Sequence, residues 1–433
     1  MSLESSASRL VTITENGLIA SDQYDVATPD AATPDVTLVP DATFAALRQL
    51  ALGTDDTDAL LTLTVRKGQQ FVRFRTYVGL LQLTDGTQIE ILPKIGDPAN
   101  ARQTLLTMLR SLRNSPFRTL KARTGTAQLP LWEVFVSTFL DVLEPLLHQG
   151  LQRAYVVTER NERFWKGQFQ PARQQRENQY HAERLAIRYE SLTVDVPPNR
   201  ILKTALLYLN NRTESARSQQ RIRRTLIALT DVPVSESITA DEAATQRTSR
   251  LFARYEPALR WAVALLNQQL PGVRAGSVTG QSLLFPMERV FEEYVAQGVR
   301  RYWPDGGAVS VQESSAHLVD EHVGSPRFKL RPDILIRQAD RTLVLDTKWK
   351  QVDGQSATGS YGIDQSDLYQ LYAYGKKYAA TDLFLIYPAN NTFQKPLSVF
   401  GYDATTRLHV VPFDCAQPLA LEVEKLARYA LQG

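Results

Sequence analysis

Two short segments carry the residue types most able to do chemistry. Arg331-Pro-Asp333 precedes one apolar stretch, and Asp346-Thr-Lys348 ends the next one. If these stretches form a hairpin with its turn at Ala339-Asp340, the register sets Asp333 directly across from Asp346, with β-carbons ~5 Å apart. Residues two apart on a strand point to the same face, so Lys348 joins the two carboxylates.

This set of side chains suits a metal-dependent phosphodiesterase. Two carboxylates so close repel each other unless a cation lies between them, and Mg²⁺ prefers carboxylate, carbonyl and water oxygens. We therefore expect Asp333 and Asp346, with the carbonyl of Thr347, to hold Mg²⁺, with Mn²⁺ as an alternative. Lys348 would orient the attacking water or stabilise the developing negative charge.

The opposing interpretation is an exposed hairpin whose aspartate and lysine form a weak surface ion pair. A shift of one residue in the register would also separate the three side chains, because it turns a whole strand over.

A helix expected at about residues 366–379 adds a polar face. Gln370 and Tyr374 are four residues apart and share one side of that helix, among several tyrosines and lysines. Such groups suit the sugar-phosphate backbone of a nucleic acid, so both are candidate substrate-binding residues. The alternative is that the leucines of this helix are core and its polar residues are simply solvated.

The remaining elements of the last third must position these residues. They comprise a helix from about Pro286, strands at about 308–319, 328–338 and 341–350, strands at Leu383–Tyr387, Leu397–Tyr402 and Leu408–Phe413, and a C-terminal helix. This order predicts an α/β sandwich.

Upstream of residue 276 the sequence changes character twice. Residues 22–44 are rich in Asp, Pro, Ala and Thr and predict a loop, whereas 60–95 alternate like strands around a hairpin turn at Asp85-Gly86. Residues 101–262 have a mostly helical pattern. We therefore expect a β-rich domain over 1–100, a basic, mostly helical region over 101–275 and an α/β domain over 276–433.

Composition is typical of a folded globular chain. The 433 residues carry a net charge of +3, distributed as −6 over residues 1–100, +10 over 101–260 and −1 over 261–433. This asymmetry favours a polyanion near Arg221, Arg223 and Arg224, although solvated helix faces would give the same pattern. The sequence shows no signal peptide and no membrane span, and its one cysteine, Cys415, fits a cytoplasmic protein.

The chemistry-bearing residues resemble a known pattern. Glu292 on the helix after Pro286, followed by Asp333, Asp346-Thr-Lys348 and Gln370-xxx-Tyr374, is similar to the RecB-like branch of the PD-(D/E)XK nuclease superfamily. The resemblance implies a restriction-endonuclease-like α/β core. In it, Glu292 joins the two aspartates as a metal ligand, Lys348 is catalytic, and the Gln-xxx-Tyr helix contacts DNA.

Four further segments resemble the McrC family, the nuclease subunit of 5-methylcytosine-specific restriction systems: Tyr77–Ile95, Gly150–Tyr155, Pro198–Lys203 and Met287–Val295. The resemblance implies a Mg²⁺-dependent endodeoxyribonuclease whose N-terminal domain docks on a hexameric AAA+ GTPase, McrB. That partner also reads the modified double-stranded DNA. The sequence departs from the family at Trp165–Phe169, where Arg-Gly-Arg is expected.

A nucleotide-binding motif is missing from the sequence. The segment Gly276–Ser282 comes nearest to a Walker A motif, but it has the wrong spacing and no lysine. We therefore expect this chain to bind no nucleotide and the motor to be a separate chain. Two alternatives remain: a stand-alone RecB-like DNA repair or recombination nuclease, and a non-catalytic DNA-binding regulator of a motor.

Overall fold

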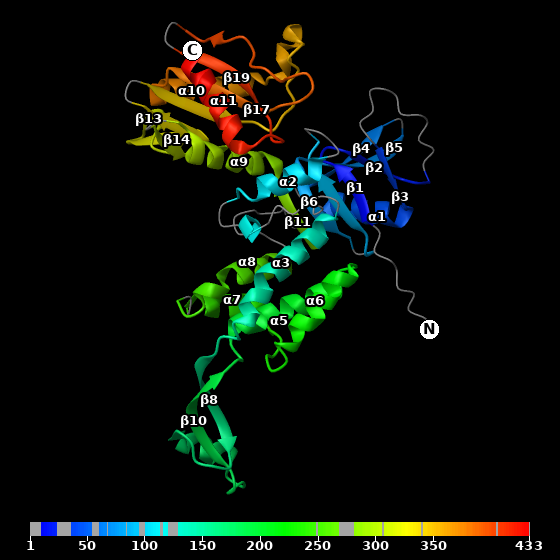
Figure 1. The fold of residues 1–433 in the computed structure, drawn as a ribbon, viewed down its shortest axis with the longest axis vertical. Coiled ribbons are helices and arrows are strands. Elements are labelled where there is room, and N and C mark those ends of the chain that lie inside the picture. The colour runs from blue at the N-terminus through cyan, green and yellow to red at the C-terminus, as the bar shows by residue number, and fades with distance from the viewer. Residues whose placement is uncertain are drawn as a thin grey trace. The chain divides into compact units, whose positions relative to one another are not determined.

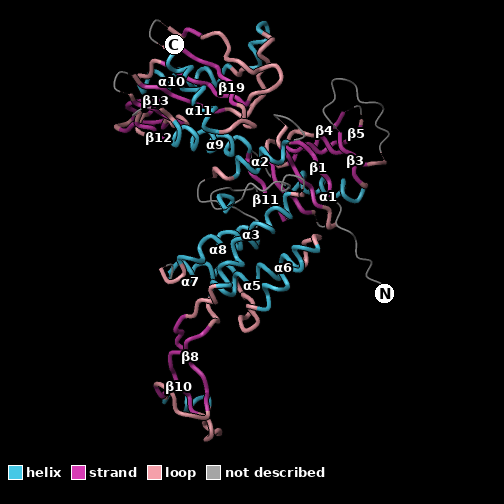
Figure 2. Tube along the Cα trace, viewed as in Figure 1, coloured by secondary structure: helices cyan, strands magenta, loops and turns pink. Residues whose placement is uncertain are grey.

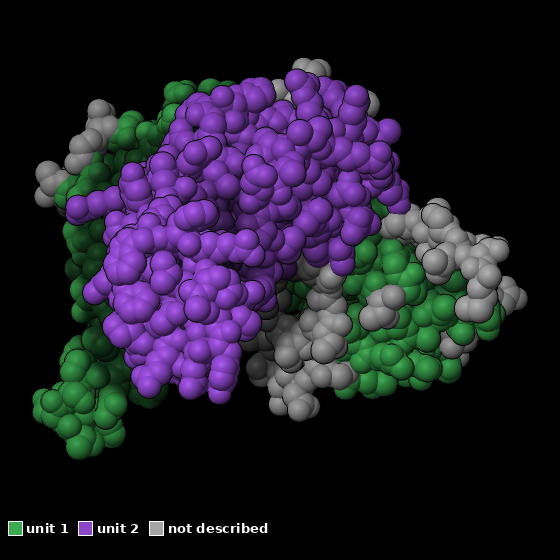
Figure 3. Space-filling view, turned by 90° about the horizontal axis from the view of Figure 1, so that it is seen from below, with its two compact units in different colours: residues 1–131, 269–433 green, residues 132–268 purple. Residues whose placement is uncertain are grey.

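The structure is a computed structural model. It describes residues 10–23, 36–53, 60–66, 68–83, 85–94, 100–112, 116–119, 129–247, 250–267, 281–304, 307–338, 341–403 and 406–432. The chain forms two compact units, shown in different colours in Figure 3. Unit 1 comprises residues 1–131 and 269–433, and unit 2 comprises residues 132–268.

The N-terminal part of unit 1 contains two four-stranded sheets (Figure 1). The first has the order β1-β7-β6-β11, with β1 Leu10–Thr14, β7 Gln88–Leu92, β6 Tyr77–Gln82 and β11 Gln281–Pro286. The second has the order β3-β2-β5-β4, with β3 Val36–Val39, β2 Leu18–Ser21, β5 Gln69–Phe74 and β4 Leu61–Arg66. The helices that accompany them are α1 Asp41–Gly53, α2 Ala101–Leu109 and the 3-10 helix Pro116–Thr119.

The predicted hairpin at Asp85-Gly86 is confirmed. Strands β6 and β7 pair antiparallel from Gly79–Ile91 to Gln82–Gln88. The side chain of Asp85 accepts a hydrogen bond from the backbone of Thr87 at 2.9 Å, as expected of an aspartate in a turn.

The expected loop over residues 22–44 is wrong in its last part. Residues 36–39 form β3, parallel to β2, and α1 begins at Asp41. Residues 24–35 lie outside the described range. The loop was predicted from amino-acid composition. The short run Val-Thr-Leu-Val forms a strand only because it pairs with β2, which is not adjacent to it in the sequence.

Strand β11 completes the N-terminal sheet, although unit 2 separates it in the sequence from the other strands of that sheet. It pairs with β6, and Gly79 has φ of +122° with no room for a β-carbon, which would lie 2.1 Å from the carbonyl oxygen of Leu283. The helix α9 Met287–Tyr302 begins at the end of this strand. The chain therefore passes from the N-terminal sheet to the candidate catalytic region without a linker.

The C-terminal part of unit 1 is built on a six-stranded sheet. Its order is β12-β15-β16-β17-β19-β18, with β12 Ala308–Val311, β15 Ile334–Arg337, β16 Thr342–Thr347, β17 Asp382–Pro388, β19 Arg407–Phe413 and β18 Phe400–Gly401. Three central strands run parallel, β16, β17 and β19. The other elements are the β13–β14 hairpin His317–His322 and Ser325–Lys329, the 3-10 helix Ala357–Gly362, and the helices α10 Gln365–Tyr378 and α11 Leu419–Gln432.

Helices cover both faces of this sheet. Leu371 of α10 packs with Val344 and Leu383, whereas Phe291 of α9 contacts Phe413. Because side chains alternate between faces along a strand, α10 and α9 lie on opposite sides. Every residue of β17 is buried, as expected for a parallel strand covered on both faces.

Most expected elements of this region are confirmed, with three differences. The expected strand Leu397–Tyr402 is reduced to the two residues of β18, Phe400–Gly401. The expected strands 308–319 and 328–338 are each divided, into β12 and β13 and into β14 and β15. The first break falls at Gln312, whose φ of +51° a strand does not tolerate. None of the helices in the described ranges is long and apolar enough to cross a lipid bilayer.

Unit 2 combines a helical bundle with a small sheet. The helices are α3 Leu131–His148, α5 Pro197–Asn210, α6 Ala216–Ile227, α7 Ile238–Arg247, α8 Glu256–Asn267 and the 3-10 helix Ala253–Tyr255. The sheet has the order β8-β10-β9, with β8 Ala154–Glu162, β10 Leu185–Thr193 and β9 Gln168–Phe169, next to the short helix α4 Pro171–Glu177. Figure 2 shows the β8–β10 pair extending beyond the helices of its own unit.

The expectation of a mostly helical region missed this sheet. Six of the nine residues of β8 are exposed and none is buried, so its sequence lacks the alternation of apolar and polar residues that identifies a half-buried strand. Its stability comes from a ladder of nine residue pairs with β10.

Candidate active site

The β15–β16 hairpin has the register that its sequence predicted. Ile334 pairs with Leu345, and Arg337 pairs with Thr342. One position beyond the first of these pairs, Asp333 and Asp346 stand across from each other. The turn residues Ala339-Asp340 lie outside the described range.

Both carboxylates belong to the face of the sheet that α10 covers. Leu335 and Val344 pack in one apolar cluster with Leu371 of α10. Asp333 and Asp346 are each two positions from one of these strand residues and therefore share their face.

The two aspartates are harder to ionise than isolated ones. Burial raises the pKa of Asp346 to about 7, with a further rise from the charge of Asp333 and an opposing effect of Lys348. Burial, followed by the charge of Glu292, raises the pKa of Asp333 to about 6. Proximity and burial thus create a site in which an added cation would be stabilised.

Lys348 is the cation that the chain itself supplies. Its Nζ lies 2.8 Å from Oδ2 of Asp346 and donates a hydrogen bond of 3.2 Å to Oε1 of Gln370. Burial by itself would lower the pKa of Lys348, but the neighbouring Asp346 outweighs it and the net pKa is raised. Lys348 is therefore a charged donor that points into the site.

Gln370 and Tyr374 join the helix α10 to the hairpin. Nε2 of Gln370 lies 2.7 Å from the Tyr374 hydroxyl, which donates a 3.0 Å hydrogen bond to the carbonyl of Arg331. Gln370 is exposed, whereas Tyr374 is 3% exposed. Gln370 can therefore reach a ligand in solvent, and Tyr374 holds it against the segment that leads to Asp333.

Thr347 fixes the orientation of Asp333. Its backbone N–H and its hydroxyl both donate to Oδ2 of Asp333, at 2.7 and 2.8 Å. The sequence had suggested a role only for the carbonyl of Thr347, although a hydroxyl side chain between Asp346 and Lys348 is the feature that could have indicated this second role.

Glu292 is linked to the backbone of Asp333 through Gln312. Nε2 of Gln312 donates to Oε1 of Glu292 at 2.7 Å, and its backbone N–H donates to the carbonyl of Asp333 at 2.9 Å. Burial raises the pKa of Glu292, and the charges of Glu293 and Asp346 add to the rise. No sequence pattern had marked Gln312, whose left-handed backbone is the strained conformation often found at functional sites.

The donor set fits a magnesium ion held by few protein ligands. Among the described residues, no three Asp, Glu, His or Cys side chains converge closely enough to hold a metal ion, so Glu292 is not gathered with the aspartates. Mg²⁺, however, commonly takes one or two carboxylates and keeps several waters. Oδ2 of Asp346 is buried and accepts no hydrogen bond of regular geometry from a described residue, and Lys348 is its ion-pair partner.

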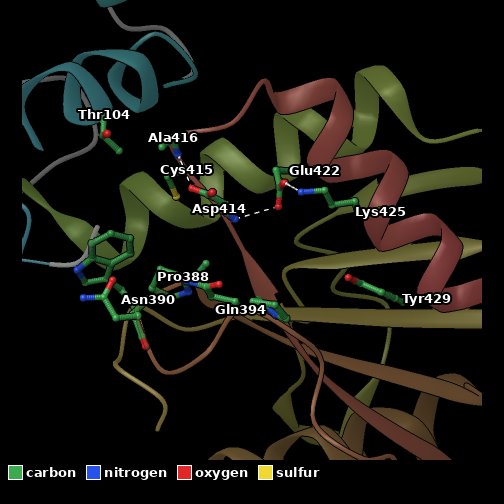
Figure 4. Close-up of a pocket in the computed structure, with 14 residues that line it drawn as sticks. Thr104, Pro388, Asn390, Gln394, Asp414, Cys415, Ala416, Glu422, Lys425 and Tyr429 are labelled. Atoms are coloured by element: carbon green, nitrogen blue, oxygen red, sulfur yellow. Dashed lines mark hydrogen bonds and ion pairs between the residues drawn. The ribbon is translucent and has the colours of Figure 1, made fainter. Parts of the chain in front are cut away.

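A separate polar cavity of about 710 Å³ lies beside Trp349 (Figure 4). Asp414 and Cys415 line it, and Glu422 accepts a 2.9 Å hydrogen bond from the backbone of Asp414. Neither Asp333 nor Asp346 lines this cavity, so it is not part of the acid pair.

The arginines of α6 do not all face solvent. Arg221 is bound at 2.8 Å to both Asp141 and Glu144 of α3, which corrects the expectation that it is free to contact a polyanion. Arg223 and Arg224 are exposed. The Walker-like residues Gly276–Gly280 lie outside the described range.

Comparisons with known proteins agree on one relationship. The family model described as "McrBC 5-methylcytosine restriction system component" matches residues 72–388. A search of the curated proteins finds no match. Among solved structures, a chain of a refined half-complex of Thermococcus gammatolerans McrB AAA+ hexamers with bound McrC has a TM-score of 0.67 at 18% identity, covering 98% of this chain and 100% of that one.

A second structure, the Thermococcus gammatolerans McrBC complex, has a TM-score of 0.47 at 18% identity, covering 69% of this chain and 89% of that one. At these identities the likeness to solved structures concerns the fold.

Proposed function

Because this chain belongs to the McrBC family of 5-methylcytosine restriction system components, we propose that it is the DNA-cleaving subunit of such a system. The observation that carries the proposal is the facing pair Asp333 and Asp346, with Lys348 2.8 Å from the second carboxylate. We further propose that the six-stranded sheet with α9 and α10 is a PD-(D/E)XK nuclease core of the RecB-like branch.

In this proposal Asp333 and Asp346 hold Mg²⁺, with Mn²⁺ as an alternative, and Glu292 contributes through water. The bound ion supplies Lewis-acid polarisation of the scissile phosphate and lowers the pKa of a bound water. Thr347 keeps one oxygen of Asp333 engaged, so the other is presented in a fixed direction.

Lys348 and α10 act on the substrate side. The ammonium of Lys348 is placed to stabilise negative charge on the phosphate as it develops. Gln370 is exposed and contacts the DNA backbone, while Tyr374 holds the amide of Gln370 in position through the 2.7 Å contact.

The partner in this proposal is a separate AAA+ GTPase similar to McrB. The solved structure that this chain resembles over 98% of its length contains McrB AAA+ hexamers with bound McrC. We propose that the N-terminal sheets dock on such a hexamer in the cytoplasm, that the partner hydrolyses GTP and recognises methylcytosine, and that double-stranded DNA is the substrate.

The test is cleavage of methylated duplex DNA by the purified chain, with and without the AAA+ partner, GTP and Mg²⁺. We expect double-strand breaks only when all are present. Asp346→Asn should abolish cleavage while complex formation and GTP hydrolysis continue.

Two results would favour other functions. Efficient cutting by the chain alone would indicate a stand-alone repair or recombination nuclease. A complex that translocates but never cuts would indicate a regulator, the alternative favoured by the lack of a three-ligand cluster among the described residues.

A further inference from the structure

A buried hydrogen bond joins the N-terminal sheets to the catalytic strand. Nε1 of Trp349 donates to Oε1 of Glu15 at 2.6 Å, and the two residues are 4% and 1% exposed. Trp349 directly follows Lys348. A residue near the start of the chain thus reaches the position next to the candidate catalytic lysine.

The two N-terminal sheets of unit 1, called the N-terminal module below, hold Glu15 rigidly. Its backbone N–H donates to the carbonyl of Leu92 at 2.8 Å, and Oε1 also accepts a 3.1 Å hydrogen bond from the backbone of Lys94. Asn16, the next residue, has φ of +59°, the left-handed conformation of a tight turn. The carboxylate therefore cannot move without moving β1 or β7.

Packing alone does not fix the indole of Trp349. One neighbour is Phe291, whose ring centroid lies 5.3 Å away and which precedes Glu292. Trp349 also lines the cavity of about 710 Å³. Because a side chain that lines a cavity has fewer packing contacts on that side, the hydrogen bond to Glu15 contributes to setting the orientation of the ring.

The arrangement has an energetic cost. Oε2 of Glu15 is buried and accepts no hydrogen bond from a described residue, and burial raises the pKa of Glu15 to about 7. An unsatisfied buried oxygen destabilises the fold. The fold nevertheless keeps this side chain buried as the acceptor of the indole N–H.

We propose that Glu15 is a positioning residue for Lys348, acting through Trp349. The inference rests on the proposed nuclease function. The strand end that carries Lys348 is held on one side by the backbone hydrogen bond from Lys348 to Ile386, at 2.9 Å. The Glu15–Trp349 contact holds it on the other side, so the N-terminal module determines where the ammonium of Lys348 lies relative to Asp346.

The test uses the full-length chain with its AAA+ partner. Glu15→Leu removes the acceptor, Glu15→Gln retains an acceptor oxygen, and Trp349→Phe keeps the ring but removes the donor. We expect Glu15→Leu and Trp349→Phe to slow single-turnover cleavage ~10- to 100-fold at unchanged DNA affinity and GTP hydrolysis. Glu15→Gln should recover most of the rate, and the double variant should be no slower than the slower single one.

A second measurement does not depend on cleavage. The rate at which a small acylating reagent modifies Lys348, followed by mass spectrometry, should rise in Glu15→Leu because the ion pair with Asp346 loosens. Lys376, which is paired with Asp403 at 2.6 Å, is the matched control and should not change.

The outcomes separate the two proposals. A wild-type complex that never cuts DNA overturns the nuclease function. Unchanged Lys348 acylation, or cleavage within twofold of wild type in both Glu15→Leu and Trp349→Phe, overturns the positioning role. Should Glu15→Leu fail to fold, Trp349→Phe decides, because it preserves the aromatic packing on Phe291.

Discussion

The ammonium of Lys348 lies 2.8 Å from the carboxylate of Asp346, a side chain that is 2% exposed. An ion pair at the surface would be weak and replaceable. This one instead lies at the end of a fully covered strand, opposite a second carboxylate. In the proposed nuclease, this position would bring three side chains that are ordinary by themselves together in one reactive site.

Lys348→Ala should reduce cleavage ~100- to 1,000-fold, because it removes a charged donor that acts on the transition state. DNA affinity should change little. The measurement is a single-turnover assay with the partner present. Lys376→Ala, on the neighbouring helix and paired with Asp403, is the control, and equal losses in both variants would contradict a specific role for Lys348.

Thr347→Val should weaken Mg²⁺ binding and cleavage ~10-fold, since it removes one of the two hydrogen bonds that orient Asp333. The backbone bond and the side-chain volume remain. Titration of Mg²⁺ against cleavage rate measures the effect. Thr342→Val, at the other end of the same strand, should behave as wild type; if it is impaired as much, the loss reflects the strand rather than the site.

Stability should depend on pH through the acid pair. Asp333 and Asp346 have pKa values of about 6 and about 7 in the folded chain, against an ordinary value of 3.8. Between roughly pH 4 and pH 7 the folded protein therefore keeps protons that the unfolded chain has lost, and stability falls as pH rises. Mg²⁺ should restore it at pH 7 and above.

Thermal melting of wild type and Asp346→Asn across this range tests the pH effect. The variant should show a smaller decline and a weaker response to Mg²⁺. Parallel curves would mean that the two aspartates do not interact as their positions indicate.

Binding of DNA by unit 2 should depend on Arg223 and Arg224 rather than on Arg221. Replacing the two exposed arginines by glutamine should reduce the slope of log affinity against log salt by about 2, if each contacts one phosphate. Arg221→Gln should instead lower the melting temperature, because it removes the ion pairs that Arg221 forms with Asp141 and Glu144. An unchanged slope in the double variant would mean that these arginines lie on a solvated helix face and do not contact DNA.

Prediction from the sequence was most accurate for elements whose structure depends on neighbouring residues. The register of the β15–β16 hairpin follows from its turn, and α9 and α10 follow from their periodicity and flanking residues. It failed where pairing with another strand decides: β3 forms by pairing with β2, and β8, which has no buried residue, forms by pairing with β10. Gln312 was missed because its role depends on a backbone conformation that no residue pattern marks.

Contacts between residues far apart in the sequence also limit how the N-terminal module can be studied. Deleting residues 1–95 would remove β6 and leave the buried Leu283–Phe285 of β11 without a partner, together with Trp349 without Glu15. Such a truncation would expose apolar surface in the remaining fold. Point substitutions are therefore the sound way to separate partner docking from catalysis.

The pairing of β6 with β11 also has a consequence for biosynthesis. The ribosome releases residues 77–82 long before residues 281–286, with the whole of unit 2 between them. The edge of β6 remains unpaired while ~200 residues are added. At ~5–20 residues per second, this takes ~10–40 s. During that interval the nascent chain carries an unpaired strand edge, which is prone to pair with strands of other chains.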